Sequence, residues 1–274
     1  MNYVTLNNNL KMPQLGFGVW QVEDAQATEA VAKALETGYT SIDTAMIYKN
    51  EIGVGKALKD TKVPRENLFI TTKVWNSDQG YENTLRAFDE SLERLGLDYV
   101  DLYLIHWPTP EFDDYIDTYK AMEKLYNDGR VKAIGVCNFE IEHLERLLAE
   151  CDVPPVLNQV ECHPYLAQNE LKEFCAKHNI YVEAWSPLEQ GGEVLQDETI
   201  RKIAEAHGKT PAQAVLRWHL QNNTIAIPKS VTPSRIEENF DVFDFELSAD
   251  EMEQINALNK DRRKGAHPVE MNVR

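Results

Sequence analysis

The sequence predicts an α/β fold, a (β/α)8 or TIM barrel, from two observations. A short apolar run is followed by an amphipathic helical stretch eight times along the chain. The length of 274 residues also fits such a barrel, which takes about 250 residues, with modest additions. Because no linker or low-complexity segment interrupts the alternation, we expect a single domain over residues 1–274.

A β-hairpin is expected before the first barrel strand. Residues 3–13 hold two short extended pieces on either side of asparagines 7–9. We expect this N-terminal hairpin to close the barrel floor. Residues 259–274 lack any periodicity, which predicts an extended C-terminal tail over the surface.

The eight predicted barrel strands are nearly continuous apolar runs. This pattern is typical of a parallel sheet whose two faces are both covered, and it disfavours hairpin topologies. The predicted strands are residues 14–20, 40–45, 68–74, 100–106, 131–139, 156–163, 181–188 and 224–230.

The stretches between the strands have helical period. In residues 81–96 the apolar side chains recur at helical spacing and Gly96 supplies the C-terminal stop. Two further helices are expected to begin sharply, because Thr210-Pro211 and Thr232-Pro233 each place a capping hydroxyl before a proline at the first helical position.

The composition disfavours several classes of partner. The formal net charge of −17 and a pI near 4.8 disfavour affinity for nucleic acid or anionic membrane, which would require a basic surface. The first residues lack an apolar core of signal-peptide length, and no later run resembles a membrane span. We therefore expect a soluble, cytoplasmic protein, and a monomer, since no coiled coil or long apolar stripe demands a partner.

The cysteines are expected to be free thiols, mostly buried. They show no CxxC spacing, and a chain of this length does not need disulfides to stabilise its fold. The four are Cys137, Cys151, Cys162 and Cys175.

Four side chains suited to carbonyl chemistry, Asp43, Tyr48, Lys73 and His106, lie at or just past the ends of the second, third and fourth predicted strands. The loops after the strands of a parallel barrel meet at one mouth, so these side chains can converge. Taken singly, each has a commoner structural role in packing, turns or surface solvation. Their joint placement, without a Ser or Cys nucleophile elbow, favours proton donation to a polarised carbonyl.

The charges of this group suggest roles for its members. A lysine inside a barrel mouth is desolvated and needs a negative partner, for which Asp43 is placed. A neighbouring ammonium favours phenolate, so we expect Lys73 to lower the pKa of Tyr48 from its ordinary value of about 10. With a lowered pKa, Tyr48 would be a better proton donor than an ordinary tyrosine.

No metal site is predicted. The histidines show neither HxH nor HExxH spacing, and only His106 and His163 fall at strand ends, which is too few ligands. In contrast, Trp20, Trp75 and Trp107 all fall at or just after strand ends. One such tryptophan would be assigned to the core, but three suggest an apolar, water-poor substrate pocket.

An anion site is predicted in IPKSVTPSRIEENF near the C-terminus. Lys229 and Ser230 end the last strand, and Arg235, Glu238 and Asn239 share one face of the following helix. A helix N-terminus with a lysine and an arginine suits a phosphate. The alternative is a solvated helix start with an Arg-to-Glu pair. A bound nucleotide would not use a Rossmann fingerprint, since no GxGxxG follows a strand.

Taken together, the segments LGFGVWQ, SIDTAMIYKNEIGVGKAL, TTKVW, DLYLIHWP, GVCNF, NQVECHPY, AWSPL and IPKSVTPSRIEENF resemble the aldo-keto reductases over essentially the whole chain. The short loops are similar to those of the prokaryotic 2,5-diketo-gluconate and methylglyoxal reductase group. The resemblance implies a (β/α)8 barrel that uses NADPH to reduce aldehydes and ketones, its small-molecule carbonyl substrates, to alcohols.

The resemblance also implies roles for individual residues. Tyr48 would donate the proton, Lys73 and Asp43 would tune it, and His106 would orient the carbonyl. Asn138 and Gln159 would hold the nicotinamide carboxamide and Trp185 would stack on its ring. The remaining cofactor contacts would be Ser186 and Leu188 along the pyrophosphate, Lys229, Ser230 and Arg235 at the 2′-phosphate, and Glu238 and Asn239 at the adenine.

Two positions depart from the family pattern. Cys137 stands where many members have serine, so a hydroxyl contact to the carboxamide would be lost or weakened. Trp185 stands where many have tyrosine, which changes the ring that stacks on the nicotinamide. The four catalytic positions are intact.

Our hypothesis is therefore an NADPH-dependent reductase whose substrate is a small dicarbonyl, a keto-sugar or an aromatic aldehyde. The alternatives are a Schiff-base aldolase that uses Lys73, and a nucleotide-binding regulatory barrel without turnover.

Overall fold

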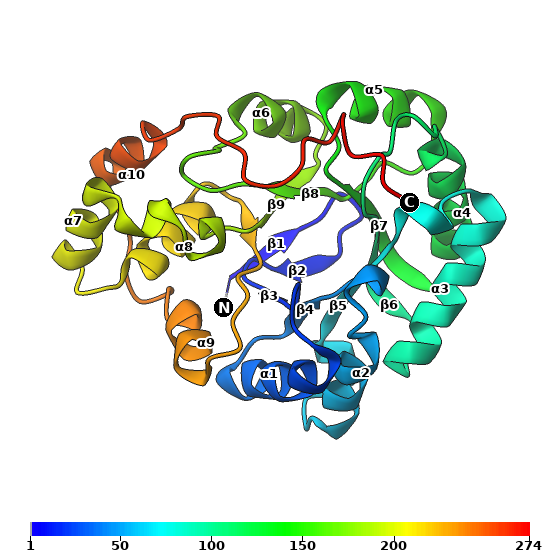
Figure 1. The fold of residues 1–274 in the computed structure, drawn as a ribbon, viewed down its shortest axis with the longest axis horizontal. Coiled ribbons are helices and arrows are strands. Elements are labelled where there is room, and N and C mark those ends of the chain that lie inside the picture. Colours follow the sequence, from blue (N-terminus) through cyan, green and yellow to red (C-terminus); the bar gives the residue numbers. More distant parts are fainter. Residues whose placement is uncertain (1) are drawn as a thin grey trace.

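Eight parallel strands form the centre of the molecule in the computed structural model, which describes residues 2–274 (Figure 1). The strands are β3 (Phe17–Gly18), β4 (Ser41–Asp43), β5 (Phe69–Val74), β6 (Val100–Ile105), β7 (Val131–Cys137), β8 (Leu157–Glu161), β9 (Tyr181–Trp185) and β10 (Ile225–Ala226). Each pairs with the next in chain order. The first and last strands meet where the Gly16 N–H donates to Ala226 O at 2.9 Å and the Ala226 N–H donates to Gln14 O at 3.0 Å. The predicted barrel is confirmed.

Helices surround these strands (Figure 1). They are α1 (Asp24–Thr37), α2 (Glu51–Asp60), α3 (Tyr81–Leu95), α4 (Tyr115–Asn127), α5 (Ile141–Glu150), α6 (Asn169–Lys177), α7 (Glu198–Ala206), α8 (Pro211–Gln221), α9 (Pro233–Phe240) and α10 (Ala249–Asn256). In α3, Phe88, Leu92 and Leu95 are buried, and Gly96 ends the helix in the left-handed conformation with φ 65°. The predicted periodicity and stop are confirmed there.

Two glycines of α2 allow close helix packing. A Cβ on Gly53 would lie 2.1 Å from Asp24 O in α1, and a Cβ on Gly55 would lie 2.5 Å from Leu95 O in α3. Any larger residue would force these helices apart.

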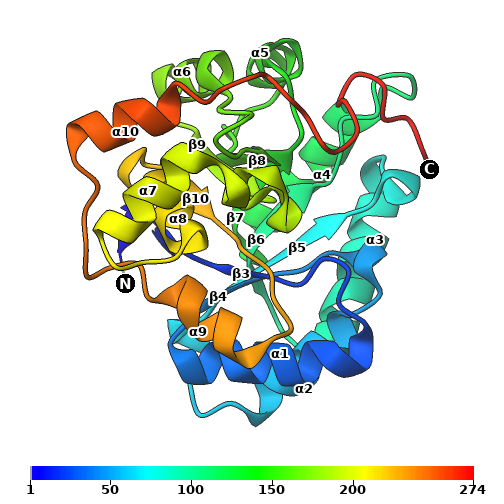
Figure 2. The same ribbon diagram turned by 60° about the vertical axis from the view of Figure 1, so that its left-hand side comes forward.

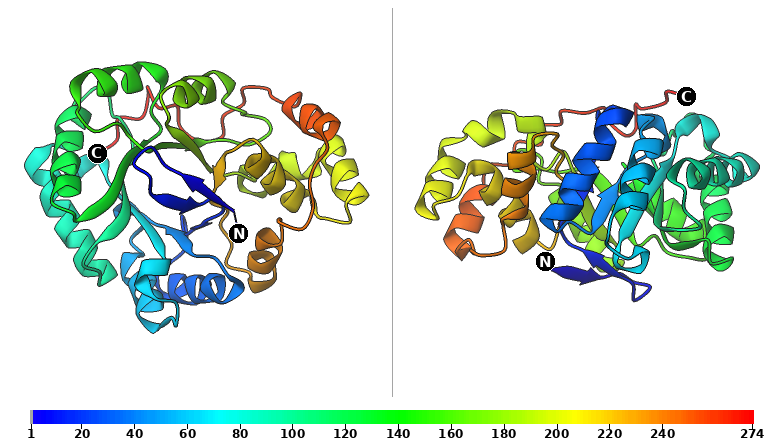
Figure 3. Two further views of the ribbon diagram at one scale, coloured as in Figure 1. Left: turned by 180° about the vertical axis from the view of Figure 1, so that it is seen from behind. Right: turned by 90° about the horizontal axis from the view of Figure 1, so that it is seen from below.

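The predicted N-terminal hairpin is present on the floor of the barrel (Figure 3). Strands β1 (Tyr3–Thr5) and β2 (Lys11–Pro13) pair antiparallel. Val4, Leu6 and Met12 pack against inward side chains of the barrel strands, among them Leu102 and Leu104. Burial of these apolar groups closes the bottom of the barrel to water.

Several predicted strands extend beyond the observed ones. The prediction for residues 14–20 reduces to two paired residues, and those for 181–188 and 224–230 run past the observed ends of β9 and β10. Pro187 and Pro228 explain the last two, because proline cannot donate to a strand ladder. The chain leaves the sheet there and forms the wall of the mouth.

The two predicted helix caps differ. The Thr210 hydroxyl accepts from the Gln213 N–H and forms a capping box at the start of α8, as predicted. Thr232 precedes α9, but its hydroxyl makes no capping bond, so that part of the prediction is wrong. Instead the Thr232 N–H donates to the Ser230 hydroxyl at 3.0 Å, which turns the chain into the helix.

The C-terminal tail crosses the mouth side of the barrel from α10 past α6 and α5 to α4 (Figure 2). Glu161, at the end of β8, accepts from the Lys264 N–H at 2.7 Å and the Gly265 N–H at 2.8 Å. Burial opposes ionisation of Glu161, but these bonds and one from His163 outweigh it and lower its pKa. The predicted extended tail is thus held by a buried carboxylate.

The four cysteines are free, and Cys137, Cys162 and Cys175 are buried, as expected. Among residues 2–274, no helix is both long and apolar enough to span a membrane.

Candidate active site

A cavity of about 1050 Å³ opens at the carboxyl ends of the barrel strands. Asp43, Tyr48 and His106 line it, while Lys73 is fully buried in the wall behind them. Asp43 ends β4, Lys73 lies on β5 and His106 directly follows β6. The structure therefore brings together all four predicted catalytic side chains.

The Lys73 ammonium is the centre of this group. Its Nζ donates to Asp43 Oδ1 at 2.6 Å and to Thr44 O at 2.9 Å, and it lies 3.5 Å from the Tyr48 hydroxyl oxygen. An ammonium has three donors, and each has an acceptor here. The cation is thus fixed beside the phenol.

A rigid turn carries Tyr48. The residue ends the short 3₁₀ helix η1 (Met46–Tyr48), and Lys49 follows with φ 57°. Asn50 fixes this turn to the barrel, because its Nδ2 donates to Val19 O and Val22 O, both at 2.9 Å, and its Oδ1 accepts from the Thr44 hydroxyl. The phenol position is therefore set by buried hydrogen bonds.

The expected net fall in the pKa of Tyr48 is wrong. Burial raises the pKa of Tyr48 well above its ordinary value, and the lowering by Lys73 offsets only part of this. Burial also acts to lower the pKa of Lys73, but Asp43 and then Tyr48 outweigh it and raise that pKa. Desolvation is thus larger than the single attraction considered from the sequence. The resting pair is a neutral phenol next to a charged ammonium.

His106 is a neutral imidazole. Burial, followed by the Lys73 charge, lowers the pKa of His106 well below its usual range. Its Nε2 lies 3.5 Å from the Tyr48 hydroxyl, and the Trp75 ring meets the imidazole edge-on with centroids 5.1 Å apart. A neutral imidazole has one N–H, so His106 can donate to an oxygen near the phenol without adding a charge.

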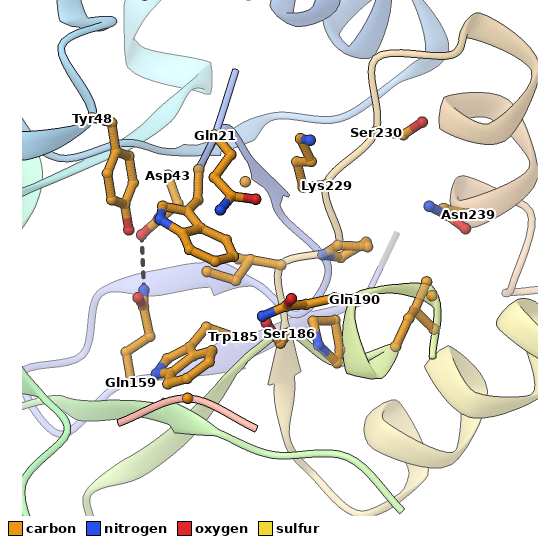
Figure 4. Close-up of a pocket in the computed structure, with 18 of the residues that line it drawn as sticks. Gln21, Asp43, Tyr48, Gln159, Trp185, Ser186, Gln190, Lys229, Ser230 and Asn239 are labelled. Carbon is orange, nitrogen blue, oxygen red and sulfur yellow. Dashed lines mark hydrogen bonds between the residues drawn. The ribbon is translucent and has the colours of Figure 1, made fainter. Parts of the chain in front are cut away.

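The amide side chains expected at the carboxamide come from β8 and from the residue directly after β7. Gln159 Nε2 donates to Asp43 Oδ2 at 2.8 Å, drawn in Figure 4 as a dashed line. Asn138 follows β7 with φ 60°, and its Nδ2 donates to His106 O at 2.9 Å. Both residues line the cavity.

Trp185 is held in place by a bond that a tyrosine could not make in the same way. Its indole N–H donates to Asn138 Oδ1 at 2.8 Å. The tail packs on the same ring, since a Cβ on Gly265 would lie 2.5 Å from Trp185 Cη2. The larger ring therefore has a fixed position at the cavity wall (Figure 4).

Cys137 does not reach the cavity. Its side chain is fully buried in the cluster that contains Leu102 and Leu104, and it is absent from the cavity lining. Being one residue before Asn138 on a strand, it points inward to the barrel core. The structure thus gives no direct contact for the thiol at the cofactor position that the resemblance implied.

The other predicted cofactor residues extend the cavity away from Tyr48. Ser186, Leu188, Lys229, Ser230, Arg235, Glu238 and Asn239 all line it. Figure 4 shows Lys229, Ser230 and Asn239 along the wall opposite Ser186. Glu238 accepts from the Thr210 hydroxyl at 2.8 Å, and no ion pair joins it to Arg235 in the described structure. The Arg-to-Glu pair of the alternative is therefore wrong. Lys229 and Arg235 are exposed, as at a solvated helix start, and remain available to an anion.

The three predicted pocket tryptophans all line the cavity. Trp107 is buried, Trp75 is half-buried and Trp20 is 41% exposed. They give the cavity an apolar wall, with Trp20 at its rim.

Several lining residues were not predicted. Gln21 lies in a turn after β3, Gln190 and Gly191 lie in the short 3₁₀ helix η4 (Glu189–Gly191), and Ala266 and Met271 come from the tail. Such positions depend on loop conformation, for which the sequence carries no signal. No cluster of three or more potential metal-ligating side chains occurs within residues 2–274.

A fold of this kind, with a tyrosine, a lysine, an aspartate and a histidine converging at one end of a long cavity, defines a class of barrel oxidoreductases. The sequence model of the aldo/keto reductase family matches residues 14–260. The chain belongs to the aldo/keto reductase family and is an oxidoreductase, so the expected family and enzyme class are confirmed.

Individual relatives are similar over nearly the whole chain. Glyoxal reductase of Bacillus subtilis is 56% identical, covering 98% of this chain and 96% of its own length. Methylglyoxal reductase DkgA of Escherichia coli K12 is 53% identical, covering 97% and 96%. The protein in the crystal structure of a Gox0644 mutant in complex with NADPH is 51% identical, and the match covers 97% of each chain with a TM-score of 0.94.

Proposed function

We propose that this protein reduces aldehydes and ketones to alcohols with NADPH and that Tyr48 is the proton donor. One observation carries the proposal. The Tyr48 hydroxyl lies 3.5 Å from both Lys73 Nζ and His106 Nε2, at the end of a cavity that continues to Lys229 and Arg235. This geometry supports proton delivery at one end of the cavity and phosphate binding at the other.

The residues at the phenol end have separate tasks in this mechanism. When bound, NADPH supplies the hydride from its nicotinamide C4. His106 donates its N–H to the substrate carbonyl and orients it, and Tyr48 transfers its hydroxyl proton to the same oxygen. Lys73 stabilises the phenolate that forms, and Asp43 holds the ammonium in place.

The opposite end fits a nucleotide with a 2′-phosphate. Lys229 and Arg235 are exposed, line the cavity and have no carboxylate partner among the described residues. Ser230 adds a hydroxyl next to the start of α9, where the helix N-terminus favours an anion. Glu238 and Asn239 follow on the same helix face, where they would meet the adenine.

The cavity also fits the nicotinamide end of NADPH. Gln159 and Asn138 present amide groups to the cavity, and Trp185 presents its ring. Ser186 and Leu188 lie between these two ends and would line the pyrophosphate. We propose small dicarbonyls, keto-sugars and aromatic aldehydes as substrates, and the names of the glyoxal and methylglyoxal reductases similar to this chain favour dicarbonyls.

The alternative reactions are less well supported. A Schiff-base aldolase needs a neutral amine, but Asp43 and Tyr48 raise the pKa of Lys73 and keep it protonated. A regulatory barrel without turnover would not require the four catalytic positions to converge. Borohydride trapping of a substrate on Lys73 would support the aldolase.

We also propose that the whole chain acts as one domain and as a cytoplasmic monomer. Support for one domain comes from the two chain ends, which both pack on the same barrel. Sedimentation equilibrium tests the monomer.

The direct test of the function is Tyr48→Phe. This variant keeps the ring and loses the proton, so NADPH oxidation with methylglyoxal is expected to fall by about 100-fold or more, while NADPH binding stays within about threefold. Binding is measured by fluorescence titration and turnover by absorbance at the nicotinamide band. Near-normal turnover in this variant would reject Tyr48 as the donor.

A further inference from the structure

Glu183 is a buried carboxyl that the mechanism above does not use. It lies in the middle of β9 and is 1% exposed. Its Cα partner on β8 is Gln159, and Gln159 Nε2 donates to Glu183 Oε2 at 2.7 Å. On the other side, β10 places Ile225 opposite it.

The Gln159 amide is shared between two carboxyl side chains. One hydrogen of Nε2 goes to Asp43 Oδ2 at 2.8 Å and the other to Glu183 Oε2 at 2.7 Å. The amide faces this way because an inverted amide would set its oxygen against the Asp43 carboxylate, while Glu183 Oε2 accepts the second hydrogen. Gln159 Oε1 accepts from no described residue, and Gln159 lines the cavity. The amide thus presents an acceptor to a ligand.

The titratable groups that act on Glu183 come from three other strands. Asp43 lies on β4, Lys73 on β5 and Cys137 on β7. Lys73 forms its ion pair with Asp43, and no described cation pairs with Glu183. Burial, and then the Asp43 charge, raise the pKa of Glu183 to about 8. Cys137 stays a neutral thiol, since burial raises its pKa well above the ordinary value.

Building on the proposed function, we propose that Glu183 is a positioning residue for carbonyl reduction, which acts through Gln159 on the Asp43–Lys73 pair. Its hydrogen bond orients the Gln159 amide toward the cofactor carboxamide. When Glu183 is protonated, Asp43 is the one negative charge beside Lys73. When Glu183 is ionised, it adds a second negative charge next to this pair. An additional negative charge opposes formation of the Tyr48 phenolate, so reduction is faster when Glu183 is protonated.

The experiment compares the pH dependence of kcat in the wild type, Glu183→Gln and Glu183→Leu, with saturating NADPH and methylglyoxal between about pH 6 and pH 9.5. We expect wild-type kcat to fall at least about fivefold above an apparent pKa of about 8. Both variants lack the ionisable group, so their kcat is expected to vary less than about twofold over the same range. Either variant suffices if the other does not fold.

The KM for NADPH tests the orienting role of Glu183 separately from the effect of its charge. Glu183→Gln retains an acceptor for Gln159 and is expected to keep a nearly normal KM, whereas Glu183→Leu removes it and raises KM by about fivefold or more. The control is Glu123→Gln, which neutralises another buried carboxyl, one that caps the Asp152 and Val153 N–H groups away from the cavity. Its pH profile should match the wild type.

A wild-type pH profile in Glu183→Gln and Glu183→Leu would overturn the inference. An enzyme that reduces no carbonyl in the panel would instead reject the proposed function itself. If the wild type turns over and Tyr48→Phe does not, the function stands, and the Glu183 profiles then test the positioning role alone.

Discussion

Removal of the Lys73 ammonium tests the electrostatics of the site most directly. Lys73→Met keeps the length of the side chain and removes a charge that lies 3.5 Å from the Tyr48 oxygen. With an effective dielectric constant of about 20, the attraction between an ammonium and a phenolate at that distance is about 5 kcal/mol. A transition state with the proton about half transferred feels about half of this, so kcat is expected to fall on the order of 100-fold.

The same change also affects folding, because Asp43 would remain buried without its cation. Breaking such a pair costs about 3–5 kcal/mol in the free energy of unfolding. The double variant Asp43→Asn with Lys73→Met removes both charges, and its amide oxygen can still accept from Gln159 Nε2. We expect it to regain at least half of the lost stability while kcat stays low.

The assays are steady-state NADPH oxidation with methylglyoxal at saturating cofactor, and urea unfolding at neutral pH. A Lys73→Met enzyme whose kcat stays within about threefold of wild type would refute the reasoning, because the structure offers no second described cation near the phenol. Recovery of both stability and turnover in the double variant would also refute it, since turnover would then depend only on folding.

Three other predictions concern the rest of the cavity and the tail. In steady-state assays, Arg235→Ala should raise the KM for NADPH by about 10-fold or more and change the KM for NADH by less than about threefold. An equal rise in KM for both cofactors would contradict a contact with the 2′-phosphate. Gly265→Ala places a Cβ 2.5 Å from Trp185 Cη2, so kcat/KM for the carbonyl should fall several-fold in steady-state assays. Unchanged kinetics would contradict this, because they would show that the tail moves away from Trp185 without effect on the site. Glu161→Gln should lower the free energy of unfolding at pH 7 by about 1–3 kcal/mol. Because the folded pKa of Glu161 is lowered, its contribution is present above the unfolded pKa and lost as pH falls through the folded value, so urea unfolding should show the gap closing toward acid pH.

The barrel could be predicted from the sequence because its signals are local. Apolar runs mark strands that are covered on both faces, and Gly96 and the Thr210-Pro211 pair mark helix ends through backbone chemistry alone. The convergence of Asp43, Tyr48, Lys73 and His106 also follows from the fold, since parallel strands all end at the same mouth.

What the sequence could not supply were the quantities that depend on packing. The pKa of Tyr48 was predicted in the wrong direction because desolvation is a property of the assembled site. The Trp185 bond to Asn138 requires the left-handed backbone after β7. The sequence carried one signal for Glu183, because it is a charged residue at the centre of an otherwise apolar strand. Its partner became clear only from the register, which places Glu183 opposite Gln159.

The two ends of the chain emerge on opposite sides of the barrel (Figure 3). Asn2 accepts a backbone bond from Gln14 at the bottom, whereas Arg274 pairs with Asp114 and the Val273 carbonyl accepts from Asn76 beside the entrance. An affinity tag or fusion partner joined after residue 274 would therefore sit where substrates enter and leave. The same addition ahead of residue 2 would project from the far side, so immobilisation through that end should leave turnover unimpeded.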